Sequence, residues 1–382
     1  MPRTFDCLVV GLGGFGSAAL FHLARRGVRA LGLEQFGPAH DRGSSHGETR
    51  VIRRAYFEHP DYVPLLNRAY DLWRELESAA AQRLYVPSGL ILAARPEYEA
   101  VTGTLAVAEQ HGLDIQSLTL ADARQQFPTL DFREDEIVVY ERDAGYLFVE
   151  DCVRAHLDQA QAAGAVAHFH ETVRSIEIGS TSVRVRTDRG DYSAASLIVA
   201  GGAWSGRLLA ELNLPLRVLR KLLFWHPVLP GTAEAHQHAP CFLFQDETGV
   251  FYGFPCLDGR TLKIAEHSAG RPIDDPDHLD RSLQPQDSAA VETFIAQRRM
   301  QVSRQAERHA VCMYTMTPDQ HFIVDRHPHH QNVVIAAGFS GHGFKFTPAI
   351  GQALAELAAE GQTELPIEFL SLQRPALRCD AK

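Results

Sequence analysis

Three glycines near the start of the chain have the spacing G-x-G-x-x-G: Gly11, Gly13 and Gly16. The first allows a tight turn, the second lets backbone approach a pyrophosphate, and the third lets a helix pack closely on a strand. Glu34 closes the next apolar run, where an acid accepts hydrogen bonds from a ribose. This pattern predicts a dinucleotide site and does not distinguish FAD from NAD; a structural glycine turn is the alternative.

The elements around these glycines have the types that such a site requires. Within the expected strand over residues 6–10, the four residues after Asp6 form a short, wholly apolar run, as expected of a strand buried on both faces. A helix is predicted from the glycines to about Arg26, where Gly27 ends it, and residues 28–33 form a second buried strand. The helix would direct free N–H groups and its positive dipole end toward the phosphates. The segment is a complete β-α-β unit.

The rest of the chain changes character near Leu216. Before it we expect two helices, a hairpin and a strand, over residues 62–78, 150–163, 183–190 and 196–200. After it, strand-like segments dominate, with one helix among them, over residues 222–228, 241–244, 250–254, 261–266, 289–299 and 310–315. A buried strand over 333–337 and a helix over 348–359 end the chain. The pattern predicts a discontinuous Rossmann-type domain of residues 1–86, 143–216 and 316–382, with an inserted sheet-rich domain of residues 87–142 and 217–315.

Composition narrows the class of protein. The 382 residues carry a formal net charge of −10 and no basic block, which disfavours binding to nucleic acid or to an anionic membrane. No apolar run approaches the length of a bilayer span, and the first ten residues lack the pattern of a signal peptide, so the cytoplasm is expected. The six cysteines are too far apart for a zinc site, and a disulfide framework is unexpected at this size; they are Cys7, Cys152, Cys241, Cys256, Cys312 and Cys379.

Five further segments carry a resemblance to a known family. They are GSSHGETRVIR at 43–53, YGFP at 252–255, Lys263 with His267, CMYT at 312–315, and GFSGHGFKF at 338–346. In this order, over essentially the whole chain, they resemble the monomeric sarcosine oxidase and N-methyltryptophan oxidase family of flavoproteins. The resemblance implies an α/β plus α+β fold, with a Rossmann-type FAD-binding domain and an inserted substrate domain.

The resemblance assigns roles around the flavin. Cys312 aligns with the cysteine that forms a thioether to the flavin 8-methyl group, against the alternative of a buried structural cysteine. Lys263 aligns with the lysine that assists the reaction with oxygen, because a buried cation stabilises the superoxide charge. Lys263 and His267 are four residues apart in a predicted strand and would face the same side. The alternative for Lys263 is a solvent-facing side chain.

The resemblance also assigns the substrate and cofactor contacts. Arg53 and Lys345 align with the pair that holds the substrate carboxylate, which an arginine fork suits. Tyr252 and Tyr314 would line the substrate cavity; the alternative for Tyr252 is core packing. The residues implied in catalysis are Lys263, His267, Arg50 and Tyr252. The remaining implied cofactor contacts are Ser44, Thr49, Arg50, Val173, Gly341, His342, Gly343 and Lys345.

Three features depart from the family pattern or compete with it. Ser45 and Glu48 replace a common histidine and a common aspartate, and Ser45 is expected to alter a flavin contact. The bulky segment Phe242-Leu243-Phe244 is expected to narrow the pocket. Three histidines, His327, His329 and His330, have the side chains of metal ligands, but a solvated loop between two strands is the preferred interpretation and no metal is expected.

The predicted activity is oxidation of a small secondary amine, such as sarcosine or another N-methyl amino acid, to an imine that water hydrolyses. FAD, attached through Cys312, would be reoxidised by oxygen to give hydrogen peroxide. The partners are then an amino-acid substrate and oxygen, and a monomer is expected. The alternatives are an oxidase of a cyclic imino acid such as pipecolate or proline, a flavin dehydrogenase with another electron acceptor, and a flavin-loaded protein without catalysis. An NAD dehydrogenase is disfavoured because it would not need the Cys312 segment.

Overall fold

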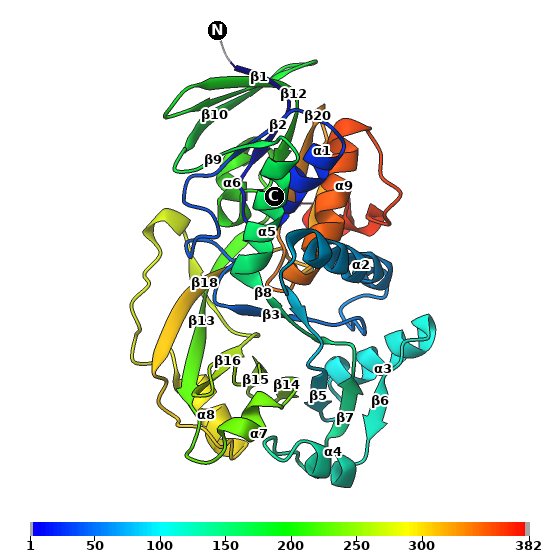
Figure 1. Cartoon of the computed structure of the whole chain (residues 1–382), viewed down its shortest axis with the longest axis vertical. Helices are drawn as coiled ribbons and strands as arrows, with labels where there is room; N and C mark the ends of the chain where they lie inside the picture. Colours follow the sequence, from blue (N-terminus) through cyan, green and yellow to red (C-terminus); the bar gives the residue numbers. More distant parts are fainter. Residues whose placement is uncertain (1–2, 379–382) are drawn as a thin grey trace.

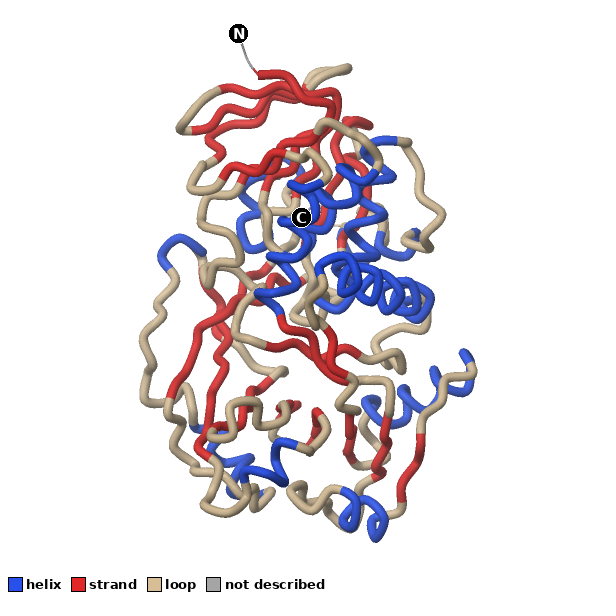
Figure 2. The backbone as a smooth tube through the Cα atoms, in the orientation of Figure 1, coloured by secondary structure: helices blue, strands red, loops and turns tan. Residues whose placement is uncertain are grey.

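The computed structural model describes residues 3–378, so Met1, Pro2 and the segment with Cys379 lie outside the described residues. The molecule is elongated (Figures 1 and 2), with one sheet near the N-terminus at one end and a second sheet at the other. None of the helices in the described part of the chain is both long and apolar enough to cross a membrane.

The first sheet has eight strands, and its centre is parallel, in the order β9-β2-β1-β12-β20. The hairpin β10-β11 and the strand β19 extend it in antiparallel fashion. In the central strands, the segments 7–10, 30–33 and 197–199 are buried and apolar, as is typical of parallel strands covered on both faces. Its strands are β1 (Arg3–Val10), β2 (Ala30–Leu33), β9 (Val166–His168), β10 (Val173–Ile178), β11 (Val183–Thr187), β12 (Asp191–Val199), β19 (Ile323–His327) and β20 (His330–Ala337).

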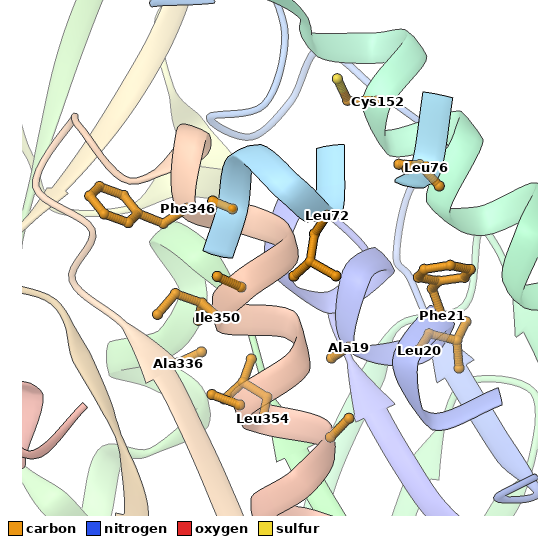
Figure 3. Close-up of a cluster of buried hydrophobic side chains, with 14 of the residues drawn as sticks. Ala19, Leu20, Phe21, Leu72, Leu76, Cys152, Ala336, Phe346, Ile350 and Leu354 are labelled. Atoms are coloured by element: carbon orange, nitrogen blue, oxygen red, sulfur yellow. The ribbon is translucent and has the colours of Figure 1, made fainter. Parts of the chain in front are cut away.

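Helices pack against this sheet through a shared apolar core (Figure 3). Helix α1 crosses α9 so closely at Gly351 that a Cβ on this glycine would lie 2.4 Å from the Cβ of Ala18. This contact fixes the start of α1, and with it the glycine loop, relative to the segment that precedes α9. The helices of this part are α1 (Gly14–Arg25), α2 (Tyr62–Ala80), α5 (Val149–Ala162), α6 (Ser205–Leu208) and α9 (Thr347–Ala359).

The second sheet has nine strands, in the order β17-β13-β16-β15-β14-β5-β7-β6, with β18 paired to β13. Its strands are β5 (Leu90–Ala94), β6 (Gln116–Leu118), β7 (Ile137–Glu141), β13 (Arg217–Pro227), β14 (Cys241–Asp246), β15 (Gly249–Gly253), β16 (Thr261–Glu266), β17 (Arg271–Ile273) and β18 (Arg308–Met316). The helices α3 (Glu99–His111), α4 (Leu120–Gln126), α7 (Ala233–Gln237) and α8 (Ala289–Gln297) belong to the same end of the molecule (Figure 1).

A small third sheet lies between the other two (Figure 1), in the order β3-β8-β4. Its strands are β3 (Thr49–Ile52), β4 (Tyr85–Val86) and β8 (Gly145–Phe148), and β3 is the end of the 43–53 segment. Short 3-10 helices occupy Gly202–Trp204, Ala210–Leu212, Pro276–His278, Phe344–Phe346, Glu368–Leu370 and Pro375–Leu377.

The predicted fold class is confirmed: one part is a Rossmann-type domain whose sheet has a parallel centre, and the other is sheet-rich. The boundaries of the two proposed domains stay a prediction. The histidine segment differs from the expected solvated loop, because His327 belongs to β19 and is only 1% exposed. Its Nε2 atom lies 3.4 Å from Glu211. Among residues 3–378, no group of three His, Cys, Asp or Glu side chains is arranged to hold a metal ion.

Candidate functional site

A cavity of about 570 Å³ runs from the glycine loop after β1 to side chains of β14 and β15. Most of the predicted site residues line it: Gly11, Gly13, Glu34, Ser44, Arg50, Arg53, Val173, Tyr252, His267, Tyr314, Gly341, His342, Gly343 and Lys345. Four predicted residues do not line it: Gly16, Thr49, Lys263 and Cys312. The fold therefore brings segments from the start, middle and end of the chain to one cavity.

The glycine loop leaves room for a phosphate only where the motif requires it. A Cβ at Gly11 would lie 2.5 Å from the carbonyl oxygen of Ala200, and one at Gly16 would lie 1.7 Å from that of Gly11. At Gly13 the nearest atom would be the Ser45 hydroxyl at 3.9 Å, so this backbone borders open space. Gly11 and Gly16 are thus packing glycines, and Gly13 is where a pyrophosphate can approach.

Glu34 is held as an ionised acceptor at the same end of the cavity. Its oxygens accept hydrogen bonds from the backbone N–H groups of Leu12 at 2.8 Å and Phe36 at 3.0 Å, and the Nε2 of His40 lies 3.3 Å away. Burial raises its pKa, but the contact with His40 and these hydrogen bonds outweigh burial and lower it. An ionised carboxylate with free lone pairs suits ribose hydroxyl donors.

Cys312 lies just behind the cavity wall. Its Sγ is 3.6 Å from the carbonyl oxygen of Ser44 and 3.5 Å from Nη2 of Arg50, while Ser44 and Met313 themselves line the cavity. Arg50 is fixed by hydrogen bonds to the carbonyl oxygens of Thr49 and Ser44, at 2.9 and 2.8 Å. Arg50 therefore links the Ser44 segment and the Cys312 thiol at the cavity wall.

The other end of the cavity holds two buried cations. Arg53 is 4% exposed and Lys345 is 6% exposed. Nη2 of Arg53 donates to both carboxylate oxygens of Glu58, at 2.7 and 2.6 Å, and the guanidinium also lies over the Tyr56 ring at 4.3 Å. Lys345 donates to the carbonyl oxygen of His342 at 2.7 Å. Arg53 therefore already holds a carboxylate, a contact that no motif in the sequence indicates.

Aromatic and imidazole side chains line the same end. Burial raises the pKa values of Tyr252 and Tyr314, so both phenols stay protonated at neutral pH. The Nδ1 of His267 lies 3.4 Å from the Tyr314 hydroxyl. Burial, and then the charge of Lys221, lower the pKa of His267 to about 3, so its imidazole is neutral. These groups offer hydrogen bonds without adding charge.

Lys263 lines a second cavity, of about 430 Å³, with Thr49 and Trp225. Strand β16 ends at Glu266, so His267 lies one residue beyond it and reaches the first cavity instead. Nζ of Lys263 donates to the carbonyl oxygens of Gly47 and Thr49 and to the Thr49 hydroxyl, at 2.5, 2.9 and 3.1 Å. These three acceptors match the three donors of an ammonium group. Burial, and then Arg50, nevertheless hold its pKa well below the ordinary value, so a nearby negative charge would favour its protonation.

The structure shows the surroundings of the bulky segment at 242–244 and of Ser45 and Glu48, the residues at which the sequence departs from the family pattern. Phe242 and Phe244 are 1% exposed in the core of the second sheet, and only Leu243 of that segment lines the cavity, so the expected narrowing by the two phenylalanines is wrong. The reason is that successive side chains of β14 point to opposite faces of the sheet, so Phe242 and Phe244 point away from the face on which Leu243 lies. Ser45 accepts a hydrogen bond from the Gly14 N–H at 3.2 Å. Glu48 accepts one from the Trp225 indole at 2.8 Å and pairs with Arg308 at the second cavity.

The cavity fits FAD on these observations: a glycine loop open only at Gly13, an acid placed for a ribose, and a long extension toward Arg50 and Tyr252. The fold and the cavity define a dinucleotide-binding oxidoreductase. Residues 6–357 match the FAD dependent oxidoreductase family. The chain belongs to this family, and FAD is its cofactor.

Named relatives cover nearly the whole chain. A monomeric sarcosine oxidase of Streptomyces avermitilis is 40% identical over 98% of this chain and 99% of its own. An N-methyl-L-tryptophan oxidase of Yersinia pestis is 32% identical, over 97% and 99%. The open form of NikD, described as an unusual amino acid oxidase essential for nikkomycin biosynthesis, superposes with a TM-score of 0.86 at 25% identity, with 97% of each chain covered.

Proposed function

We propose that this enzyme oxidises N-methyl amino acids with oxygen, giving a primary amine, formaldehyde and hydrogen peroxide. The observation that carries the proposal is the pair Arg53 and Lys345 at the far end of the FAD cavity, beside the neutral groups Tyr252, Tyr314 and His267. Two cations suit one carboxylate, and neutral acceptors suit a secondary amine that must lose its proton to react. Relatives named for sarcosine and for N-methyl-L-tryptophan support the same substrate class. We further propose that the protein is a monomer and that it lies in the cytoplasm; the name of the bacterial relatives describes them as monomeric.

The side chains supply binding and orientation, while bound FAD supplies the acceptor for a hydride equivalent. Arg53 and Lys345 hold the substrate carboxylate and so direct the N-methyl group toward the centre of the cavity. Glu58 occupies Arg53 in this structure. The carboxylate therefore replaces Glu58 or shares the guanidinium with it. The balanced reaction consumes one amine, one O₂ and one water for each primary amine, formaldehyde and peroxide.

A substrate panel tests this function. Oxygen uptake, peroxide and formaldehyde are measured with sarcosine, N-methyl-L-alanine, N-methyl-L-tryptophan, L-pipecolate and L-proline. We expect equal amounts of the three quantities with at least one N-methyl amino acid. Peroxide without formaldehyde from pipecolate or proline alone would show a cyclic imino acid oxidase instead. Flavin reduction without oxygen uptake would show a dehydrogenase.

Binding of a carboxylate should depend on the protonation of Lys345. Burial, and then the charge of Arg53, lower the pKa of Lys345 to about 7, so the ammonium is present below that pH and is lost as the pH rises through it. We expect the Kd of acetate, followed by the flavin spectrum, to rise by up to about tenfold per unit above about pH 7. Lys345→Met should bind acetate weakly without this slope. A wild-type Kd that stays constant from about pH 6 to about pH 9 would contradict the role.

We also propose a thioether between Cys312 and the FAD 8-methyl carbon. The S–C bond replaces one S–H and one C–H bond; the two electrons pass through the flavin to O₂, which leaves as hydrogen peroxide with the two hydrogens. The support is the position of Sγ behind the wall at Ser44, next to Arg50. Cys312→Ser should release all of its flavin into the supernatant on acid precipitation, whereas the wild-type pellet stays yellow. Flavin retained in the Cys312→Ser pellet would refute the linkage, and Cys241→Ser, a change at another buried cysteine, is the matched control.

A further inference from the structure

Arg281 makes an unusual set of contacts next to Cys312. It lies between β17 and α8, outside every segment that carries the family resemblance. Its guanidinium donates to three backbone carbonyl oxygens: those of Asp41 at 3.0 Å, Arg42 at 2.9 Å and Val311 at 2.9 Å. No carboxylate among residues 3–378 forms an ion pair with it. A half-buried arginine that binds only backbone is placed to hold chain segments together.

The three carbonyl groups belong to the two segments that enclose the Cys312 thiol. One is the loop at residues 41–44, and the other is β18. At its far end the same loop is tied to β18 by the Ser44 hydroxyl, which donates to the carbonyl oxygen of Met313 at 2.7 Å. Arg281 thus ties the loop to β18 at residue 311 and Ser44 ties it at residue 313. Cys312 lies between these two ties, with Sγ 3.6 Å from the Ser44 carbonyl oxygen.

Arg281 acts on the cysteine through the backbone. Its guanidinium contacts the residue that precedes Cys312, whereas Arg50 contacts Sγ directly, at 3.5 Å. Arg281 forms no hydrogen bond with the thiol, so its effect on the cysteine comes through backbone position.

We propose that Arg281 is a positioning residue for the covalent attachment of FAD. It holds the loop at 41–44 against β18 so that Sγ faces the flavin methyl group. The inference rests on the proposed thioether to Cys312. Without Arg281, FAD still binds, because the glycine loop and Glu34 are untouched, but the thioether forms slowly.

The test separates binding of FAD from its covalent attachment. Full-length wild-type protein, Arg281→Gln, Arg281→Lys and the exposed control Arg271→Gln are purified with FAD present. Total bound flavin and acid-precipitable flavin are then measured over time in air. We expect every protein to bind one FAD, with attachment about tenfold or more slower in Arg281→Gln, the factor that about 1.4 kcal/mol of lost positioning gives. Arg281→Lys should also be slow, because a point charge cannot span three carbonyl groups.

Four other outcomes of this experiment would contradict the thioether or the role of Arg281. Wild-type protein without acid-precipitable flavin would refute the thioether itself. A wild-type thioether together with an equal rate in Arg281→Gln would overturn the role of Arg281 alone. Parallel loss of bound FAD and attachment in Arg281→Gln would show a general structural role and would also overturn it. If Arg281→Gln does not fold, Arg281→Lys decides, and a wild-type rate in that variant would contradict the proposal.

Discussion

Replacing Lys263 by methionine is expected to slow reoxidation of the reduced enzyme by oxygen by about 100- to 1000-fold, the range seen when one preorganised donor is removed. The reason is that electron transfer to oxygen creates an anion, which favours the protonated form of the buried Lys263, whose three donors are held in place. Reduction of the flavin by substrate should change by less than about fivefold, because Lys263 lines the second cavity and not the substrate end of the first. Stopped-flow measurement of the two half-reactions at several oxygen concentrations gives both rates.

A second buried lysine provides the control. Lys221 is 4% exposed, close to the 3% of Lys263, but it donates to the carbonyl oxygens of His267 and Ala269, beside the substrate end. Lys221→Met should leave reoxidation nearly unchanged. If Lys263→Met slowed both half-reactions equally, or if both variants slowed reoxidation equally, the oxygen site would not be at Lys263.

The change Arg53→Met is expected to lower kcat/KM for sarcosine about 1000-fold, since truncating one partner of a buried charge pair costs roughly 2 to 5 kcal/mol or more. The loss should depend on the substrate carboxylate. With the uncharged amide of sarcosine, the wild-type enzyme should already be slow and the variant should be little slower still. Steady-state oxygen uptake with both substrates gives the ratio.

A second variant separates the loss of substrate binding in Arg53→Met from the effect of the unpaired carboxylate that this change leaves behind. Glu58 loses its ion-pair partner in Arg53→Met, so the double variant with Glu58→Gln restores the charge balance. We expect this double variant to remain as poor with sarcosine as the single one. Arg83→Met, a change at an exposed arginine, is the control. If Arg53→Met discriminated between sarcosine and its amide as strongly as the wild-type enzyme does, the substrate carboxylate would bind somewhere other than Arg53.

The parts of the molecule that local pattern determines were predictable from the sequence. Gly11, Gly13 and Gly16 have spacing that only a strand-turn-helix can use, and the apolar runs beside them have the lengths of buried strands. The strand with Cys312 and the helix that begins at Thr347 were predicted to within a few residues for the same reason. The predicted roles of these residues stay predictions.

Contacts that depend on how a loop folds or on which distant segments meet were not predictable, because no period or spacing encodes them. Glu58 follows Arg53 by five residues, and its ion pair depends on how the loop between them folds. The place of His267 at the first cavity, while Lys263 lines the second, depends on where β16 ends. Arg281 reaches the loop at 41–42 from a segment almost 240 residues away. The error at Phe242 and Phe244 had a partial signal in the sequence, because alternation along a strand puts these two residues on one face and Leu243 on the other, so the three could not all face the cavity.

The central claim is that an N-methyl amino acid reduces the flavin of this enzyme and that oxygen restores it. Its most direct test is to mix the purified protein with sarcosine, and then with larger N-methyl amino acids, in the absence of oxygen, and to follow the flavin absorbance. We predict that at least one of these substrates bleaches the band and that admitting air returns it, with one peroxide formed for each flavin. A flavin that none of them bleaches, while acetate still perturbs its spectrum, would contradict the account and leave a protein that binds FAD and carboxylates without this chemistry.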